Sequence, residues 1–127
     1  MPKILLVEDD IFLSSLLGNR LKKEGFEVLN IKSGNEAVKG MKTFLPDLIL
    51  LDLILPGKSG FEVMEEINAD PQAQKTPIIV LSNLGQDTDM VKGKGLGAVQ
   101  YVVKARITID DLVKQIRDFL AANNPKA

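Results

Sequence analysis

Polar and charged side chains follow four short apolar runs of this sequence, at the point where each run ends. These side chains are Glu8, Asp9 and Asp10 after residues 4–7, Asp52 after residues 48–51, Ser82 and Asn83 after residues 78–81, and Lys104 after residues 99–103. Carboxylates that gather in one place repel one another and raise each other's pKa unless a cation lies between them. Because the chain has no histidine and no cysteine, such a cation would have oxygen ligands, which favour Mg²⁺, Mn²⁺ or Ca²⁺.

A carboxylate of this cluster can also act as a nucleophile, since aspartyl phosphates are known covalent intermediates of phosphoryl transfer. Mg²⁺ takes few carboxylates in proteins and keeps several waters, which leaves room beside it for a phosphoryl oxygen. The ammonium group of Lys104 and the hydroxyl group of Ser82 can bind further phosphoryl oxygens. The residue types therefore favour a site for metal-assisted phosphoryl transfer.

The segments that must bring these residues together include five predicted strands. Residues 4–7, 48–51 and 78–81 are continuous apolar runs, and residues 99–103 form a weaker one; such runs are typical of parallel strands covered on both faces. Residues 26–31 form a more broken run, which is typical of a strand nearer an edge of the sheet.

Helical periodicity fills the intervals between these runs. The apolar stripes are Leu13, Leu16, Leu17 and Leu21; Ala37, Val38, Met41 and Leu45; Val63, Met64 and Ile67; and Leu112, Val113, Ile116 and Leu120. Residues 86–94 should also form a helix, but Gly93 and Gly95 each cost about 1 kcal/mol relative to alanine in a helix interior. We therefore expect the fourth helix to have low stability.

Strand and helix thus alternate five times, which predicts an α/β fold with a parallel sheet and right-handed crossovers. In an open sheet of this kind, ligands bind beyond the carboxyl ends of the strands. The polar residues that follow the apolar runs are therefore expected to converge on one edge of the sheet.

The composition of the 127-residue chain limits the classes of function. A net charge of -1 gives no electrostatic case for direct binding to nucleic acid or to a membrane. The lack of cysteine excludes disulfides and zinc–thiolate sites, and the lack of histidine means that the chain cannot carry its own phosphohistidine. The start has no signal-peptide pattern and no apolar run could span a bilayer, so we expect a cytoplasmic location. Residues 1–122 are expected to form one domain, and residues 123–127 have the composition of a tail or linker stub.

A set of motifs surrounds the polar residues at the ends of the runs. They are Val7-Glu8-Asp9-Asp10, Leu51-Asp52-Leu53-Ile54-Leu55-Pro56 with Gly60 further on, Leu81-Ser82, and Tyr101 three residues before Lys104. Together they resemble the response-regulator receiver family, and the similarity covers essentially the whole chain. The resemblance implies a flavodoxin-like, doubly wound fold, with a five-stranded parallel sheet of order 2-1-3-4-5 and five helices.

The resemblance also implies a phosphorylation site and a metal site. Asp52 resembles the phosphorylated aspartate, and Lys104 resembles the cation that contacts Asp52 or its phosphoryl group. Asp9 resembles the direct Mg²⁺ ligand, Glu8 a ligand that acts through water, and the backbone carbonyl of Ile54 a further ligand. Mn²⁺ can take the place of Mg²⁺ in such a site.

Two more residues resemble the switch of the family. Ser82 resembles the hydroxyl that follows the phosphoryl group, and Tyr101 resembles the aromatic ring that changes rotamer with it. The resemblance implies a phosphohistidine donor, either a sensor histidine kinase or a phosphotransfer protein. It also implies a downstream target protein that binds the surface of the fourth helix, fifth strand and fifth helix. We expect no enzyme activity beyond assistance to its own phosphoryl transfer and dephosphorylation, and a monomer or a phosphorylation-dependent dimer.

The chain departs from the family pattern at several positions near the site. Ala105 follows Lys104, where the family usually has proline in a cis peptide bond. A cis bond before any other residue costs about 2.5–4 kcal/mol, so we predict a trans bond here or a rearranged loop. Asn83 stands where the family usually has a small residue, and it should narrow access for a phosphodonor. Ile54 and Leu84 are apolar at positions that influence how water reaches the phosphoryl group, which leads to a hypothesis of slow dephosphorylation.

Three other functions remain open at this point. Asn83 and Ala105 keep open a pseudo-receiver, an interaction module that is not phosphorylated. A flavodoxin-like domain that binds FMN would need a Ser/Thr/Gly-rich loop where this chain has Glu8-Asp9-Asp10. A metal-dependent phosphatase with an aspartate nucleophile usually carries a second aspartate where this chain has Ile54.

Overall fold

The computed structural model describes residues 1–73 and 76–123, which fold around one parallel sheet. The strands are β1 (Lys3–Val7), β2 (Glu27–Ile31), β3 (Leu48–Leu51), β4 (Ile78–Ser82) and β5 (Ala98–Val103). They pair in the order β2-β1-β3-β4-β5, and every pairing is parallel. The predicted sheet order and the edge position of the second strand are therefore confirmed.

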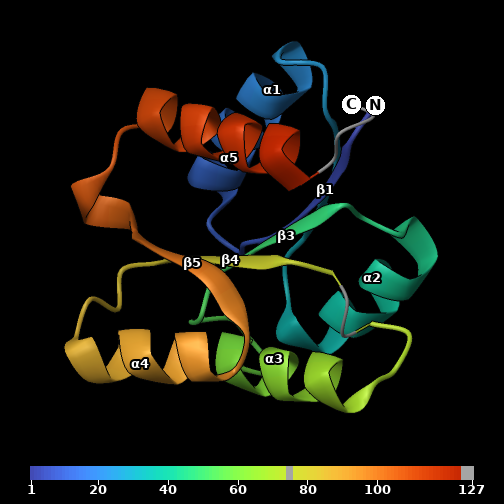
Figure 1. Ribbon diagram of the computed structural model, residues 1–127, viewed down its shortest axis with the longest axis vertical. Helices are drawn as coiled ribbons and strands as arrows, with labels where there is room; N and C mark the ends of the chain where they lie inside the picture. The colour runs from blue at the N-terminus through green and yellow to red at the C-terminus, as the bar shows by residue number, and fades with distance from the viewer. Residues whose placement is uncertain (74–75, 124–127) are drawn as a thin grey trace.

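Five α-helices cover both faces of this sheet (Figure 1). They are α1 (Ile11–Lys23), α2 (Ala37–Phe44), α3 (Gly60–Ala69), α4 (Asp87–Gly95) and α5 (Ile109–Asn123), with the short 3₁₀ turns η1 (Gly34–Glu36) and η2 (Lys104–Arg106). Figure 1 shows α1 and α5 on one face and α2, α3 and α4 on the other, which confirms the predicted doubly wound fold. Of the predicted tail at 123–127, Asn123 ends α5 and the other residues lie outside the described residues.

Each face of the sheet has its own apolar core. Along β1, Ile4 and Leu6 face α1 and α5, whereas Leu5 and Val7 face α2 and α3. All four side chains are at most 1% exposed. Burial on both faces explains why the central strands are continuous apolar runs in the sequence. Their carboxyl ends consequently emerge between two layers of helices, where polar side chains are shielded from water.

Polar caps fix the start of two helices that follow site-bearing strands. Asp10 Oδ1 accepts a hydrogen bond from the Leu13 N–H at 3.0 Å, which caps α1. Ser59 Oγ accepts one from the Glu62 N–H at 3.2 Å, which caps α3. Each cap satisfies an N–H group that has no partner within its own helix. The loops after β1 and β3 are therefore fixed by hydrogen bonds at the ends that lead into α1 and α3.

Two leucines of the predicted helical stripes are not buried. Leu16 is 47% exposed, because the face of α1 that packs on the sheet runs through Leu17 and Leu21 instead. Leu45 is 71% exposed and lies beyond the end of α2, with φ at 54°. It precedes Pro46, and the residue before a proline is disfavoured in the helical conformation, so the helix ends first.

The helices differ in how much apolar surface they contribute. The buried residues of α5 are Leu112, Val113, Ile116 and Leu120, whereas the buried residue of α4 is Gly93. The fourth helix thus forms close to where it was predicted, and its low stability stays a prediction. No helix in residues 1–73 and 76–123 combines the length and apolar character that crossing a membrane requires.

Candidate functional site

A hollow of about 240 Å³ lies at the carboxyl edge of the sheet. It is lined by Glu8, Asp9, Asp10, Asp52, Ile54, Ser82, Asn83 and Lys104. These residues belong to β4 or to the segments that follow β1, β3, β4 and β5, so the structure brings them together as the strand-end pattern led us to expect. Tyr101 lies on β5 and does not line the hollow.

Three carboxylates meet in this hollow. Glu8, Asp9 and Asp52 each have a carboxylate oxygen within 4.8 Å of the other two. Glu8 is only 1% exposed and Asp52 only 6%, whereas Asp9 is exposed to solvent. Two of the three carboxylates are therefore buried away from water, and repulsion between like charges is screened less in a buried site than in water. A buried carboxylate stays ionised only if positive charge is close by.

Lys104 supplies part of this positive charge. Its Nζ lies 3.0 Å from Asp52 Oδ2 and also pairs with Glu8 Oε1. Burial lowers the pKa of Lys104, but its hydrogen bonds to Glu8 and Asp52 outweigh burial and raise the pKa above its ordinary value. Lys104 therefore stays protonated at neutral pH and serves two buried carboxylates at once.

Glu8 is the most enclosed of the three acids. Its Oε2 accepts a hydrogen bond from the Asp10 N–H at 3.1 Å, and its own N–H donates to the Ile31 carbonyl at 2.9 Å. Burial raises the pKa of Glu8 above its ordinary value, by more than the contacts with Lys104 and Asp10 lower it. Burial therefore works against the ionised form of Glu8, and further positive charge beside it would favour that form.

The residues of the hollow fit a divalent cation. Three clustered carboxylates and one ammonium group leave an excess of two negative charges when all are ionised. A divalent cation would balance this excess, and carboxylate oxygens are the ligands that Mg²⁺ and Mn²⁺ prefer. Glu8, Asp9 and Asp52 are the side chains that would hold it.

The loop between β3 and α3 turns tightly around Asp52. The Ile54 N–H donates to Asp52 Oδ1 at 3.3 Å, and the Ile54 side chain is 59% exposed at the rim of the hollow. The Gly60 N–H donates to the Leu53 carbonyl at 2.9 Å. A Cβ atom at Gly60 would lie 2.3 Å from the Asp52 carbonyl oxygen, so the tight turn requires glycine. The role of the Ile54 carbonyl as a metal ligand stays a prediction.

The two predicted switch residues are joined through the backbone of Leu84. The Leu84 N–H donates to Ser82 Oγ at 3.4 Å, and the Tyr101 hydroxyl donates to the Leu84 carbonyl. Ser82 is fully buried, and a Cβ atom at Gly93 would lie 3.1 Å from the Tyr101 ring. The sequence did not reveal this link, because main-chain hydrogen bonds leave no signature in side-chain types.

The departures from the family pattern leave Lys104 in the site. No cis peptide bond occurs among the described residues, which confirms the trans bond predicted at Lys104–Ala105. Residues Lys104–Arg106 form η2, and Lys104 still reaches both Asp52 and Glu8. Asn83 lines the hollow and is exposed to solvent, and its effect on access for a phosphodonor stays a prediction.

The pairing of Lys104 with Glu8 is a further contact that sequence reasoning missed. Lys104 follows β5 and Glu8 follows β1, and two strands, β3 and β4, lie between them in the sheet. Residue spacing carries no signal for a contact across this distance. The long lysine side chain alone makes it feasible.

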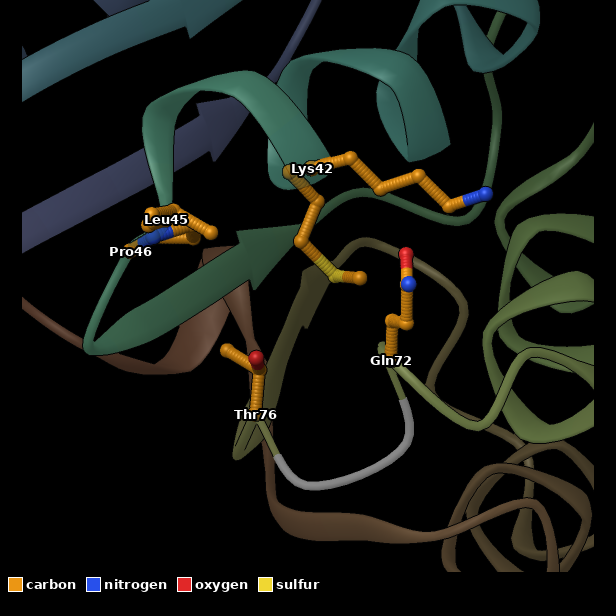
Figure 2. Close-up of a pocket in the computed structure, with 6 residues that line it drawn as sticks. Lys42, Leu45, Pro46, Gln72 and Thr76 are labelled. Atoms are coloured by element: carbon orange, nitrogen blue, oxygen red, sulfur yellow. The ribbon is translucent and has the colours of Figure 1, made fainter.

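A second hollow, of about 250 Å³, lies at the opposite edge of the sheet (Figure 2). It is lined by Met41, Lys42, Leu45, Pro46, Gln72 and Thr76. Leu45 and Pro46 precede β3 and Thr76 precedes β4, which places this hollow at the amino ends of these strands. None of the described residues that line this hollow carries a carboxylate, and its one lysine, Lys42, pairs with Asp70, which is not among the lining residues. This hollow therefore does not repeat the acidic cluster.

Curated proteins with related sequences are response regulators. The chain is 40% identical over 126 residues to the phosphate regulon transcriptional regulatory protein PhoB of Rhizobium meliloti, a match that covers 99% of this chain and 55% of PhoB. It is 32% identical over 121 residues to protein PilH of Pseudomonas aeruginosa, a match that covers 95% of this chain and 99% of PilH. The chain thus spans about half the length of relatives such as PhoB and nearly the whole length of PilH.

Solved structures of receiver domains share the fold. The BeF₃-activated N-terminal receiver domain of RstA from Klebsiella pneumoniae is 30% identical with a TM-score of 0.84, over 93% of this chain and 97% of that chain. The Mn²⁺-bound form of response regulator Rcp1 is 30% identical with a TM-score of 0.77, over 95% of this chain and 93% of that chain. Receiver domains bind a divalent metal at an acidic pocket, and the cluster of Glu8, Asp9 and Asp52 is such a pocket.

The family model of the response regulator receiver domain matches residues 4–117. This range contains every residue that lines the acidic hollow. Domains of this family are signalling domains and not classical enzymes. The chain belongs to the response regulator receiver domain family.

Proposed function

We propose that this chain is a phosphorylation-dependent switch in which Asp52 accepts a phosphoryl group from the phosphohistidine of a sensor histidine kinase or a phosphotransfer protein. The observation that carries the proposal is the environment of Asp52. Its carboxylate is 6% exposed, pairs with Lys104 at 3.0 Å, and lies within 4.8 Å of carboxylate oxygens of Glu8 and Asp9. An aspartate that merely ended a strand would be expected in solvent and without charged neighbours.

The chemistry requires one bond to form and one to break. A carboxylate oxygen of Asp52 attacks the phosphorus atom, and the phosphorus–nitrogen bond of the donor breaks as the imidazole leaves. Lys104 would hold one phosphoryl oxygen and the Ser82 hydroxyl would hold another, which their position in the hollow beside Asp52 supports. Because the chain has no histidine, the donor must be another molecule or a small phosphodonor.

We assign the cation as Mg²⁺, with Mn²⁺ fitting the same donors. Asp9, Asp52 and the Ile54 carbonyl would bind it directly. Glu8, which also pairs with Lys104, would bind it through water. When bound, the cation neutralises negative charge on the transferring phosphoryl group. Mg²⁺ suits this role because it keeps several waters that a phosphoryl oxygen can replace.

Ser82 and Tyr101 would carry the signal away from the phosphoryl group. Ser82 and Tyr101 are both hydrogen-bonded to the backbone of Leu84. A movement of Ser82 toward a phosphoryl oxygen would therefore disturb the Leu84 backbone and its hydrogen bond with the Tyr101 hydroxyl. The altered surface of α4, β5 and α5 would then be selected by a downstream target protein. The same surface could join two copies, so we expect a monomer or a phosphorylation-dependent dimer.

We also infer that the phosphoryl group is lost slowly. Ile54 lies at the rim of the hollow, and neither its side chain nor that of Leu84 can hold a water molecule by a hydrogen bond. Polar substitutions at both positions should therefore shorten the life of the phosphorylated protein. The chain would act on no substrate other than its own aspartyl phosphate.

The proposal is tested by intact mass after incubation with acetyl phosphate and Mg²⁺. The unmodified protein should gain the mass of one phosphate, and Asp52→Asn should gain none. Asp47→Asn is a matched control, because Asp47 is exposed and precedes β3 at the opposite edge of the sheet. A wild-type chain that never gains this mass would rule out the switch.

The alternative is a pseudo-receiver that binds partners without phosphorylation. Asn83 favours it, because its side chain lines the hollow beside Asp52. The mass measurement separates the two functions, since only the switch requires a modified Asp52. In either case we propose residues 1–122 as the receiver domain and residues 123–127 as a tail or linker stub. A cytoplasmic location stays a prediction.

A further inference from the structure

The segment from the end of β2 into η1, residues 30–35, contacts two loops of the acidic hollow without lining the hollow itself. One loop follows β1 and carries Glu8 and Asp9, and the other follows β3 and carries Ile54. We call residues 30–35 the brace.

The first contact is with the loop that carries the acids. The Ile31 carbonyl accepts a hydrogen bond from the Glu8 N–H at 2.9 Å. The side-chain amide of Asn30 donates to the Leu6 carbonyl at 3.0 Å and to the Glu8 carbonyl at 3.3 Å. Backbone atoms on both sides of the Glu8 side chain are therefore fixed by the brace.

The second contact is with the loop that carries Ile54. The Gly34 N–H donates to the Pro56 carbonyl at 3.1 Å. Gly34 is buried, and a Cβ atom there would lie 2.0 Å from the Lys58 carbonyl oxygen. At Gly34 the two backbones therefore approach too closely for any residue but glycine. On the facing loop, Gly57 has φ at 78°, and a Cβ atom there would lie 2.2 Å from Nδ2 of the Asn35 side chain.

We propose that the brace sets the spacing between the two metal-binding loops, so that Gly34 and Asn30 are positioning residues for the cation. This inference rests on the proposed function, because it assumes that the cation lies between these loops. Mg²⁺ demands near-ideal octahedral geometry and tolerates little displacement of its ligands. A side chain at position 34 would push the Ile54 loop outward, and loss of the Asn30 amide would release the Glu8 backbone.

The test is the dissociation constant for Mg²⁺, measured by calorimetry on the full chain. Gly34→Ala should weaken Mg²⁺ binding roughly tenfold, which is the lower range for lost support of metal ligands. Gly18→Ala is the matched control, because a Cβ atom at this buried position of α1 meets nothing within 4 Å. Its affinity for Mg²⁺ should equal that of the wild type.

A second variant covers the case in which Gly34→Ala does not fold. Asn30→Ala adds no atoms, so it should remain folded and still weaken Mg²⁺ binding, by less than Gly34→Ala. For both variants, phosphorylation by acetyl phosphate should fall at limiting Mg²⁺ and recover at excess Mg²⁺. A general loss of structure would not recover in this way.

The outcomes separate the brace from the proposed function. If the wild type binds no Mg²⁺ and gains no phosphate, the proposed function fails and the brace with it. If the wild type binds Mg²⁺ and folded Gly34→Ala or Asn30→Ala binds it equally well, the brace alone is wrong. Weaker binding in the variants, with the control unchanged, supports it.

Discussion

α4 and α5 both pack beside β5, yet they are held by different kinds of contact. α5 inserts Leu112, Val113, Ile116 and Leu120 into the core, whereas α4 presents the buried Gly93. Two further contacts lie near α4: Lys92 Nζ lies 4.4 Å from the centre of the Phe61 ring, and Asn68 Nδ2 donates to the Leu96 carbonyl at 2.7 Å. Of the two helices that flank the proposed output strand, α5 is therefore anchored by buried apolar side chains, and we expect α4 to shift at lower cost.

The largest expected effect is the loss of an anchor in α5. Ile116 is fully buried, so Ile116→Ala should lower the free energy of unfolding by about 2–5 kcal/mol. Val91 in α4 is 73% exposed, and Val91→Ala should change the free energy of unfolding by no more than about 0.5 kcal/mol. Urea unfolding of the two variants measures both values. Equal losses would remove the contrast between the helices.

Amide exchange should show the same contrast in the unsubstituted protein. Few large apolar side chains hold α4, so residues 90–94 should open locally without global unfolding. We expect their amides to exchange at least about tenfold faster than those of residues 112–120, a difference in opening free energy of about 1.4 kcal/mol. Exchange at 90–94 as slow as in the central strands would contradict a soft α4.

Gly93→Ala has two opposing effects on α4, a gain in helix stability from the loss of a glycine and a clash with the Tyr101 ring. Alanine should stabilise the helix by about 1 kcal/mol, but its Cβ atom would lie 3.1 Å from the Tyr101 ring and displace it. The chain has one tyrosine and no tryptophan, so intrinsic fluorescence reports on Tyr101 alone. Gly95→Ala is the control, because a Cβ atom there meets nothing within 4 Å. It should stabilise the protein without a change in fluorescence.

The smallest expected effect concerns the ionisation of Tyr101. Burial raises the pKa of Tyr101 above its ordinary value of 10.0, and the charges of Asp89 and Asp52 act in the same direction. The folded protein then keeps this proton at a pH where the unfolded chain loses it, so stability should fall as pH rises from 10.0 through the raised pKa. Absorbance titration of the phenol measures the pKa directly. Asp89→Asn should lower the pKa of Tyr101. An unchanged pKa would mean that the charge of Asp89 on α4 does not act on the phenol.

Most of the fold could be predicted from the sequence, because the central strands are buried on both faces and therefore contain uninterrupted apolar residues. The residues of the hollow could be predicted for a similar reason, since each one lies within three residues after an apolar run. Leu16 and Leu45 were placed wrongly, because periodicity alone does not say which side of a helix meets the sheet. The exposed position of Leu45 follows from Pro46, a local effect that outweighed the apolar pattern.

Three other contacts around the site were beyond prediction. The pairing of Lys104 with Glu8 depends on two strands that lie between them, and the link from Ser82 to Tyr101 depends on main-chain atoms. The close approach at Gly34 depends on a loop more than twenty residues further along the chain. Residue types fix which groups are present, but these distances exist only once the chain has folded.

The two hydrogen bonds at Leu84 have a consequence for how such a switch can diverge. Both use backbone atoms of this residue, so neither depends on its side chain, and proline would remove only the bond that the N–H group donates to Ser82. In the proposed switch, the side chain at position 84 could therefore vary without loss of the connection between the buried serine and the tyrosine. The duration of a signal and its transmission would then be set by separate parts of one residue.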